Sequence, residues 1–162
     1  MALYFYGQKG GHGYLSQFHN SNFVDEEGNE FFHCEQWMML NKAKLFEDEE
    51  SAIKILKERN AAKIKGLGRN VRWFKQKIWN KNRSIIVIKG NYLKFSQNEQ
   101  LKKNLLDTGD RELVEATPSS DRIWGIGYRA HEVPENRSLW GLNLLGKALM
   151  EVRSMLLQED KK

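Results

Sequence analysis

The segment from Glu35 to Phe46 (EQWMMLNKAKLF) restricts the fold more than any other part of the chain. It contains neither Gly nor Pro, and this predicts a helix. At 100° per residue, the helix carries one apolar stripe, made of Met38, Met39, Leu45 and Phe46. A stripe of this kind has to pack against other elements of the chain.

Two charged residues fall within that stripe. Glu35 and Lys42 are seven residues apart, so their directions differ by only about 20°, whereas Lys44 points to the opposite side and is expected to be solvated. Burial penalises both charges unless they pair or do chemistry. A partly buried lysine has a lowered pKa and becomes an amine nucleophile, and a carboxylate beside it can move protons. Two structural alternatives remain: Lys42 extends over Met39 to water, or it forms an ion pair with Glu35.

Composition indicates one globular domain of 162 residues, with 40% hydrophobic and 11% aromatic residues. No apolar run approaches the ~20 residues that span a bilayer, and the amino terminus does not resemble a secretory signal. The single cysteine, Cys34, excludes an internal disulfide and fits a reducing compartment. These features predict a soluble protein of the cytoplasm or nucleus, with no membrane partner.

The remaining sequence predicts several helices and a few short strands. The first thirty or so residues are expected to be extended, with a hairpin that pairs Phe23-Val24 with Phe31-Phe32 around Gly28. Further helices are expected over residues 51–65, 72–92, 98–106 and 143–158, with Gly66 and Gly68 ending the first. The run at 84–88 fits a helix or a strand, and strands are expected over 112–117 and 124–128. The predicted class is α+β: one mainly helical domain over 1–162, with a disordered tail at 158–162.

Two other clusters are chemical candidates. Asp121 lies in a turn before Trp124, and the glycines at 125 and 127 let a planar ligand approach the backbone; alternatively Asp121 only caps the turn. Gly10, Gly11 and Gly13 are compatible with a phosphate cradle. The four histidines and Cys34 lack metal-ligand spacing, so no metal is expected. P-loop and nucleophile-elbow motifs are absent.

The charge of the chain is unevenly distributed. Residues 51–97 hold thirteen Lys or Arg against one acid, Glu58, although the net charge of the chain is only +5. A stretch of this kind attracts phosphates, nucleotides or nucleic acid. The alternative is a set of solvated helix faces.

Ordered motifs along nearly the whole chain resemble the NADAR family. They are SNF at 21–23, Cys34-Glu35-Gln36 through Lys42-Ala43, Gly68-Arg69, Trp79, the long block at 94–127, and GLNLLGKALMEVR at 141–153. Gln36 stands where the family usually has histidine. The resemblance implies a YbiA-like fold and a cofactor-free N-glycosidase that cleaves the bond between ribose C1 and an amino nitrogen of a base-like ring.

The resemblance also implies the roles of single residues. Lys42 would form a Schiff base at C1, after Glu35 or Asp121 has donated a proton. Trp79 or Trp124 would stack on the ring, Arg69 and Lys94 would hold phosphates, and Asn143 would bond a ribose hydroxyl. The implied binding residues are Asn22, Phe23, Arg69, Trp79, Lys94, Trp124, Gly125 and Asn143.

Three functions are compatible with these features. The first is removal of ADP-ribose from ADP-ribosylated guanine, with ADP-ribosylated DNA or RNA as partner, which the basic stretch favours. The second is hydrolysis of phosphoribosylamino-pyrimidine intermediates of riboflavin synthesis, where the ligand is a ribose phosphate. The third is a non-catalytic module that binds ADP-ribose, against which the set Glu35, Lys42 and Asp121 argues. The oligomeric state and the choice between DNA and RNA stay open.

Overall fold

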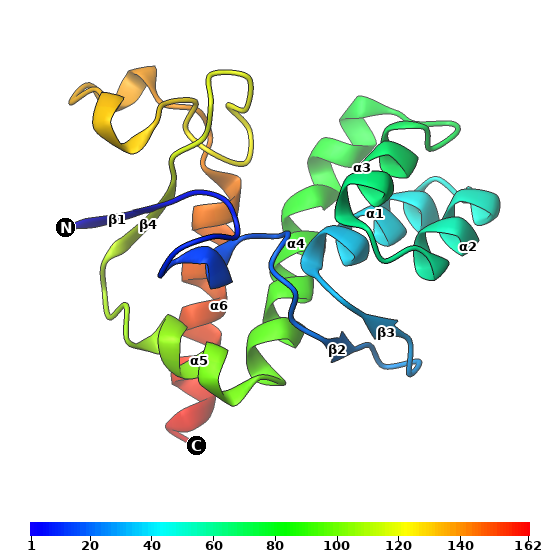
Figure 1. Ribbon diagram of the computed structural model, residues 1–162, viewed down its shortest axis with the longest axis horizontal. Coiled ribbons are helices and arrows are strands. Elements are labelled where there is room, and N and C mark those ends of the chain that lie inside the picture. Colours follow the sequence, from blue (N-terminus) through cyan, green and yellow to red (C-terminus); the bar gives the residue numbers. More distant parts are fainter. The chain divides into compact units, whose positions relative to one another are not determined.

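The computed structural model describes residues 1–162, which form two compact units (Figure 1). One unit contains Met1–Ser16 and Glu99–Lys162, and the other contains Gln17–Asn98. Both consist mainly of helices, with two two-stranded sheets in the chain. The predicted α+β class, mainly helical with a few short strands, is therefore confirmed.

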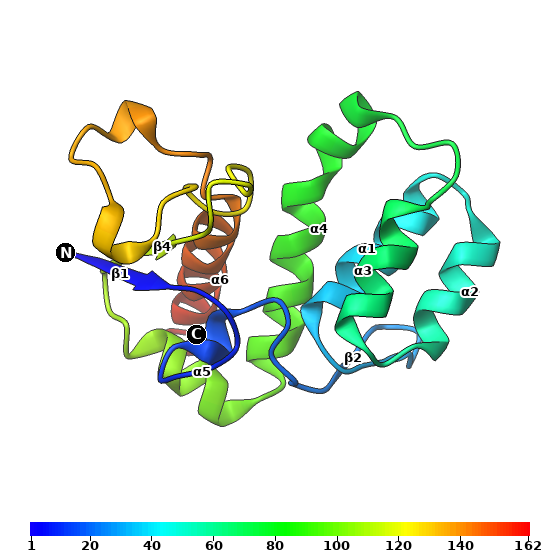
Figure 2. The same cartoon turned by 45° about the horizontal axis from the view of Figure 1, so that its top comes forward.

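The Gln17–Asn98 unit is organised around α1 (Cys34–Leu45). Helices α2 (Glu49–Lys57), α3 (Ala61–Arg69) and α4 (Gln76–Ser96) all pack against α1 (Figure 2). Because three helices surround it, every residue from 34 to 40 is buried, and the apolar stripe expected from the sequence is only part of the buried surface.

The predicted hairpin is present in this unit, but its second strand lies one residue earlier than the expected Phe31-Phe32. Strands β2 (Phe23–Val24) and β3 (Glu30–Phe31) pair antiparallel, with Phe23 opposite Phe31. Gly28 has a φ of +84°, the conformation that the turn was expected to need from glycine. The Gln97 side chain accepts a hydrogen bond from the Val24 N–H and donates one to its carbonyl, so the outer edge of β2 is covered.

The prediction of a single helix over 51–65 is wrong, because the chain forms two helices there. Glu58 is extended, and its carboxylate accepts the backbone N–H groups of Arg59 and Asn60. Asn60 then caps α3 by accepting the N–H of Lys63 at 3.0 Å. Local capping therefore ends one helix and begins the next.

Gly66 and Gly68 lie inside α3 rather than at its end. A Cβ at Gly68 would overlap the Met39 side chain, so the absence of a side chain there lets α3 approach α1 closely. Tertiary packing thus gives this glycine its role, and the prediction that it breaks a helix is corrected.

Helix α4 begins at Gln76, four residues later than predicted, and continues to Ser96. Trp73 has a φ of +60°, which no helix tolerates, so the chain turns at Arg72–Trp73 before the helix starts. The ambiguous run at 84–88 is helical. Gly90 of α4 lies against the Trp37 indole, where a Cβ would clash.

The other unit places a parallel pair of strands beside a long helix. Strand β1 (Ala2–Phe5) pairs with β4 (Glu112–Glu115), and α6 (Leu144–Asp160) packs against β4 and α5 (Glu99–Leu106). Three short 3-10 turns occupy Gly13–Leu15, Ala130–Glu132 and Arg137–Leu139. Residues 158–160, expected in a disordered tail, belong to α6.

The strand predicted over 124–128 is not formed. Carbonyl groups of Ile123 and Trp124 accept the N–H groups of Leu144 and Leu145 at 3.0 and 3.1 Å. The loop therefore satisfies the free N–H groups at the start of α6 instead of joining a sheet.

Candidate functional site

The amino end of α1 is fixed by His33. Its Nδ1 accepts the Gln36 N–H at 3.1 Å, and its Nε2 lies 3.0 Å from the Arg59 carbonyl oxygen, to which it donates. This arrangement requires the neutral imidazole, and burial lowers the pKa of His33 accordingly. The cap holds the first turn of α1, where Glu35 lies.

Gln36, the departure from the family pattern, is fully buried and ties α1 to the end of α2. Its Oε1 accepts the Phe32 N–H at 3.0 Å, and its Nε2 donates to the carbonyl oxygens of Ile55 and Glu58 at 3.1 and 3.0 Å. The amide thus has a structural role beside Glu35 that needs one acceptor and two donors at once.

Glu35 is a buried carboxyl group surrounded by cations. Only 4% of its surface is exposed, and burial raises its pKa to about 7. The positive charges of Lys65, Lys42 and Arg69 oppose that rise without reversing it. A carboxyl group with a pKa near neutrality can both give and take a proton under physiological conditions.

Lys42 is half-buried against aromatic rings. Its Nζ lies 4.7 Å from the centroid of Phe74 and 5.6 Å from the ring of Trp79. Burial lowers the pKa of this amine, and the charge of Glu35 partly restores it. The two groups interact through charge without forming an ion pair, so the structural ion pair considered from the sequence is not formed. Lys44 is exposed, as predicted.

The structure brings Glu35, Lys42, Arg69 and Trp79 together within one unit. Arg69 is exposed at the last turn of α3, whereas Trp79 is 8% exposed, with the amine of Lys42 over its ring. Lys65 and Phe74 also lie at this site, although neither was expected there from the sequence. The pair Lys65 and Arg69, four residues apart, shares one helix face, but the expected helix end at Gly66 concealed that spacing.

Lys94, Phe23 and Asn22 lie elsewhere in the same unit. Lys94 is completely buried, and burial lowers its pKa to about 8. Phe23 is buried and stacks on Phe31 with centroids 5.3 Å apart, so its ring belongs to the core. Asn22 is exposed, and its carbonyl accepts a hydrogen bond from Asn98. The binding roles of these three residues stay predictions.

Asp121, Trp124 and Gly125 belong to the other unit. The Oδ1 of Asp121 accepts the N–H groups of Ile123 and Trp124 at 3.1 and 2.9 Å, which is the turn-capping role considered from the sequence. Gly125 lies where a Cβ would overlap Thr117. The catalytic role of Asp121 and the ligand contacts of Trp124 and Gly125 stay predictions.

The side chain of Asn143 forms hydrogen bonds with the backbone of β4, as a neighbouring strand would. Its Oδ1 accepts the Glu115 N–H and its Nδ2 donates to the Leu113 carbonyl, both at 3.0 Å. The residue is buried and has a left-handed backbone with φ +52°, a conformation that asparagine tolerates better than most residues. Its predicted bond to a ribose hydroxyl stays a prediction beside this observed structural one.

No three His, Cys, Asp or Glu side chains are grouped so as to hold a metal ion. None of the helices combines the length and hydropathy that crossing a membrane requires. The charged groups that interact at the candidate site are the carboxyl of Glu35, the amine of Lys42 and the cations Lys65 and Arg69.

Known proteins are similar to this chain in sequence and in fold. The NADAR domain model matches residues 4–157. N-glycosidase R617 of Acanthamoeba polyphaga mimivirus is 48% identical over 147 residues, which cover 86% of this chain and 85% of that protein. The NMR structure of the Escherichia coli protein YbiA matches with a TM-score of 0.81 and 26% identity, covering 99% of this chain and 88% of that one. The chain belongs to the NADAR family.

Two further relatives are longer than the matched region. Protein irg-1 of Caenorhabditis elegans is 42% identical over 130 residues, which cover 77% of this chain and 61% of that protein. A riboflavin biosynthesis protein of Vibrio vulnificus (strain YJ016) is 30% identical over 154 residues, covering 95% of this chain and 38% of that protein. The predicted family, fold and enzyme class, N-glycosidase, are confirmed by these matches.

Proposed function

We propose that the chain removes ADP-ribose from ADP-ribosylated guanine, in nucleic acid or nucleoside, through a Schiff base on Lys42. One observation carries this proposal: Glu35 and Lys42 share one face of α1, and burial moves the pKa of each toward neutrality. Such a pair supplies a proton donor and an uncharged amine at the same pH.

The chemistry follows from these two groups. Glu35 donates a proton to the ribose ring oxygen, and the ring opens to an iminium between C1 and the guanine nitrogen. The neutral amine of Lys42 attacks C1, and the guanine amine leaves with a proton, so that C1 is joined to Nζ as an imine. Water then adds to C1, the C1–Nζ bond breaks to free the Lys42 amine, and the proton released in this hydrolysis returns to the Glu35 carboxylate. The aldehyde at C1 closes again to the ribose ring.

Three other residues are proposed to take part, two by binding and one by proton transfer. Arg69 and Lys65 supply positive charge beside Glu35, which suits a diphosphate next to the ribose. Asp121 is proposed as a second proton donor, although its carboxylate also caps a turn.

The test uses an oligonucleotide with one ADP-ribosylated guanine, incubated with the protein and cyanoborohydride. Reduction of the imine leaves a stable amine, so intact-protein mass spectrometry should show the mass of ADP-ribose added to the wild type. Lys42→Ala should lose both adduct and turnover. Lys44→Ala is the matched control, because it removes an exposed lysine two residues away on the same helix and should keep both.

The outcomes separate the parts of the proposal. Turnover with no adduct would reject the Schiff base and transfer the chemistry to Glu35 and Asp121. The absence of both turnover and adduct would reject the guanine substrate.

A second function is favoured by the Vibrio vulnificus relative, which is named a riboflavin biosynthesis protein. It is hydrolysis of phosphoribosylamino-pyrimidine intermediates, whose bond to C1 is chemically similar. Activity on these small substrates should hardly depend on salt, whereas activity on an oligonucleotide should fall steeply as salt rises. A module that only binds ADP-ribose would show binding without turnover on either substrate.

A further inference from the structure

The turn that joins α3 to α4 displays an aromatic ring in a strained conformation. Trp73 has a φ of +60° and is 63% exposed, whereas that conformation normally falls to glycine or asparagine. A large side chain gains nothing for the core here. Strain at an exposed side chain indicates a functional role.

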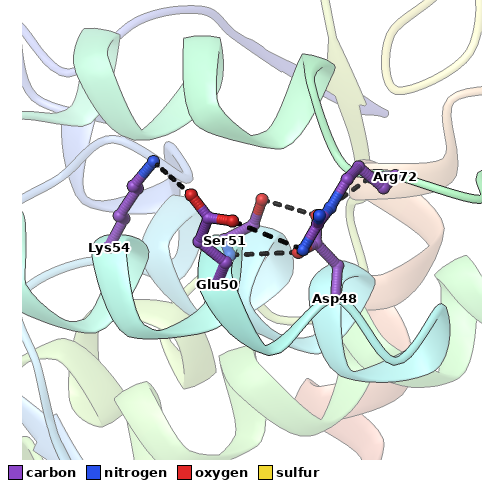
Figure 3. Close-up of polar contacts among 5 residues, drawn as sticks. All are labelled: Asp48, Glu50, Ser51, Lys54 and Arg72. Atoms are coloured by element: carbon purple, nitrogen blue, oxygen red, sulfur yellow. Dashed lines mark hydrogen bonds and ion pairs between the residues drawn. The ribbon is translucent and has the colours of Figure 1, made fainter.

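The backbone of this turn is held by Asp48. Its carboxylate accepts the backbone N–H and the guanidinium of Arg72, at 2.9 and 3.1 Å, as well as the Ser51 hydroxyl at 2.6 Å (Figure 3). These bonds hold the pKa of Asp48 well below its usual range, with the Arg72 backbone bond the largest cause. Arg72 also lies over the Trp73 ring at 4.7 Å from its centroid. The turn is therefore anchored on one side and presents the indole on the other.

Exposed cations continue from the turn along the first half of α4. Lys75, Lys77 and Lys81 are exposed and form no ion pair, and residues 59–98 contain no acid. Lys77 and Lys81 lie within about 40° of each other on α4. Cations next to an exposed aromatic ring match the charged backbone and the stacked bases of single-stranded nucleic acid.

The same turn reaches the candidate catalytic amine. Phe74 follows Trp73 directly, and its ring lies 4.7 Å from the Nζ of Lys42. A base stacked on Trp73 would thus lie one residue along the chain from Phe74, the ring that covers Lys42.

We propose that Trp73, Lys75, Lys77 and Lys81, here called the Trp73 surface, bind single-stranded nucleic acid that flanks the modified base. Trp73 stacks on a base, and the three lysines contact phosphates. This proposal rests on the proposed function for its purpose, but the binding itself is measured with unmodified strands.

The experiment measures fluorescence anisotropy of a labelled, unmodified oligonucleotide of about twelve nucleotides over a range of salt concentrations. Trp73→Gly should weaken binding about tenfold and leave the salt slope unchanged. Since glycine accepts φ +60°, this variant should unfold at the same temperature or higher. Trp73→Phe should recover part of the affinity because it keeps a ring.

Lys77→Ala with Lys81→Ala should lower the salt slope by about 1.4, the value for two phosphate contacts on a single strand. The matched control is Lys57→Ala with Lys63→Ala. Lys57 is the last residue of α2, at the other end of the helix from Asp48, and Lys63 lies in the first turn of α3. Because neither belongs to the Trp73 surface, this pair should change affinity by less than about twofold.

Equal effects of the two lysine pairs would overturn the proposal, and so would unchanged binding by Trp73→Gly. Ile78 and Ile85 are also exposed, so vesicles with anionic lipid are included; binding to vesicles and not to oligonucleotide would replace nucleic acid by a membrane surface. Normal strand binding without turnover of the modified oligonucleotide would leave this surface standing and reject only the proposed function. Turnover without strand binding would reject the Trp73 surface and leave the proposed function standing.

Discussion

The amine nitrogen of Lys42 lies 4.7 Å from the centroid of the Phe74 ring, although the two residues are 32 positions apart in the chain. Phe46 packs against the same ring with centroids 5.2 Å apart. Phe74 is 39% exposed, so it separates the amine from solvent without sealing it. The turn before α4 thus contributes one of the aromatic rings that surround the Lys42 amine.

Replacing Phe74 with Ala should raise the pKa of Lys42 toward its ordinary value. Burial is the main cause of the lowered pKa, and removing the ring admits water that stabilises the ammonium form. The alkaline limb of the rate profile should move to higher pH, and kcat/KM at pH 7 should fall. Phe32→Ala is the control, because it removes a ring that lies under Arg59 instead of Lys42. It should change neither the alkaline limb nor kcat/KM at pH 7. A shift of the limb to lower pH would show that attraction between the ring and the ammonium dominates instead.

The rate should depend on pH as a bell whose acidic limb lies near pH 7. In the reactive form, Glu35 and Lys42 together carry one proton. Below the pKa of Glu35, about 7, both groups are protonated, and above the pKa of Lys42 both are deprotonated, so the reactive form is lost on either side. Glu35→Gln should lower kcat by about a hundredfold or more and abolish the alkaline limb, because the remaining requirement, a neutral Lys42 amine, is met better as pH rises. An alkaline limb that persists in Glu35→Gln would assign the proton donor to another group.

Glu35 should also make the fold less stable as pH rises. Its folded pKa, about 7, is above its ordinary value of 4.5, so the unfolded chain loses this proton first. The stability that the protonated carboxyl contributes is fully present below pH 4.5 and is lost by pH 7, at most about 3 kcal/mol. Urea unfolding at pH 4 and pH 8 should show this loss in the wild type and in Glu49→Gln, a control at an exposed position, but not in Glu35→Gln.

Two glycines inside helices should respond to alanine in opposite ways. Gly90→Ala places a methyl group against the rigid Trp37 indole and should destabilise the protein by about 1–2 kcal/mol, because overpacking outweighs the gain in helix propensity. Gly66→Ala meets no atom within 4 Å and should stabilise by about 0.5–1 kcal/mol. Thermal unfolding measures both, and a stabilising Gly90→Ala would contradict the close packing of α4 on α1.

Asn143 should matter for stability before it matters for ligand binding. Asn143→Ala loses two hydrogen bonds to β4 and puts a Cβ residue without a polar side chain at φ +52°, so about 3 kcal/mol is expected to be lost. Asn143→Gly accepts the backbone angle and should lose about 2 kcal/mol. If both variants unfold like the wild type while KM rises, the ribose contact predicted from the sequence would account for the residue.

Much of the secondary structure follows from residues close in the chain. The period of the segment 35–46 predicted α1 and the shared direction of Glu35 and Lys42, and Gly28 predicted the hairpin turn. These features are local, because the neighbours along the chain already set the helix period and the turn angle. The family motifs then supplied the class of enzyme.

The sequence by itself therefore determined α1, the order of the motifs and the charged pair on one helix face. Tertiary structure decided the rest: the division of 51–65 into two helices, the packing role of Gly68, the pairing of Asn143 with β4, and the cations around Glu35. The physical reason is that burial and charge depend on residues brought close by folding. The same glutamate has an ordinary pKa on an exposed helix and a pKa of about 7 when three other helices pack around its own.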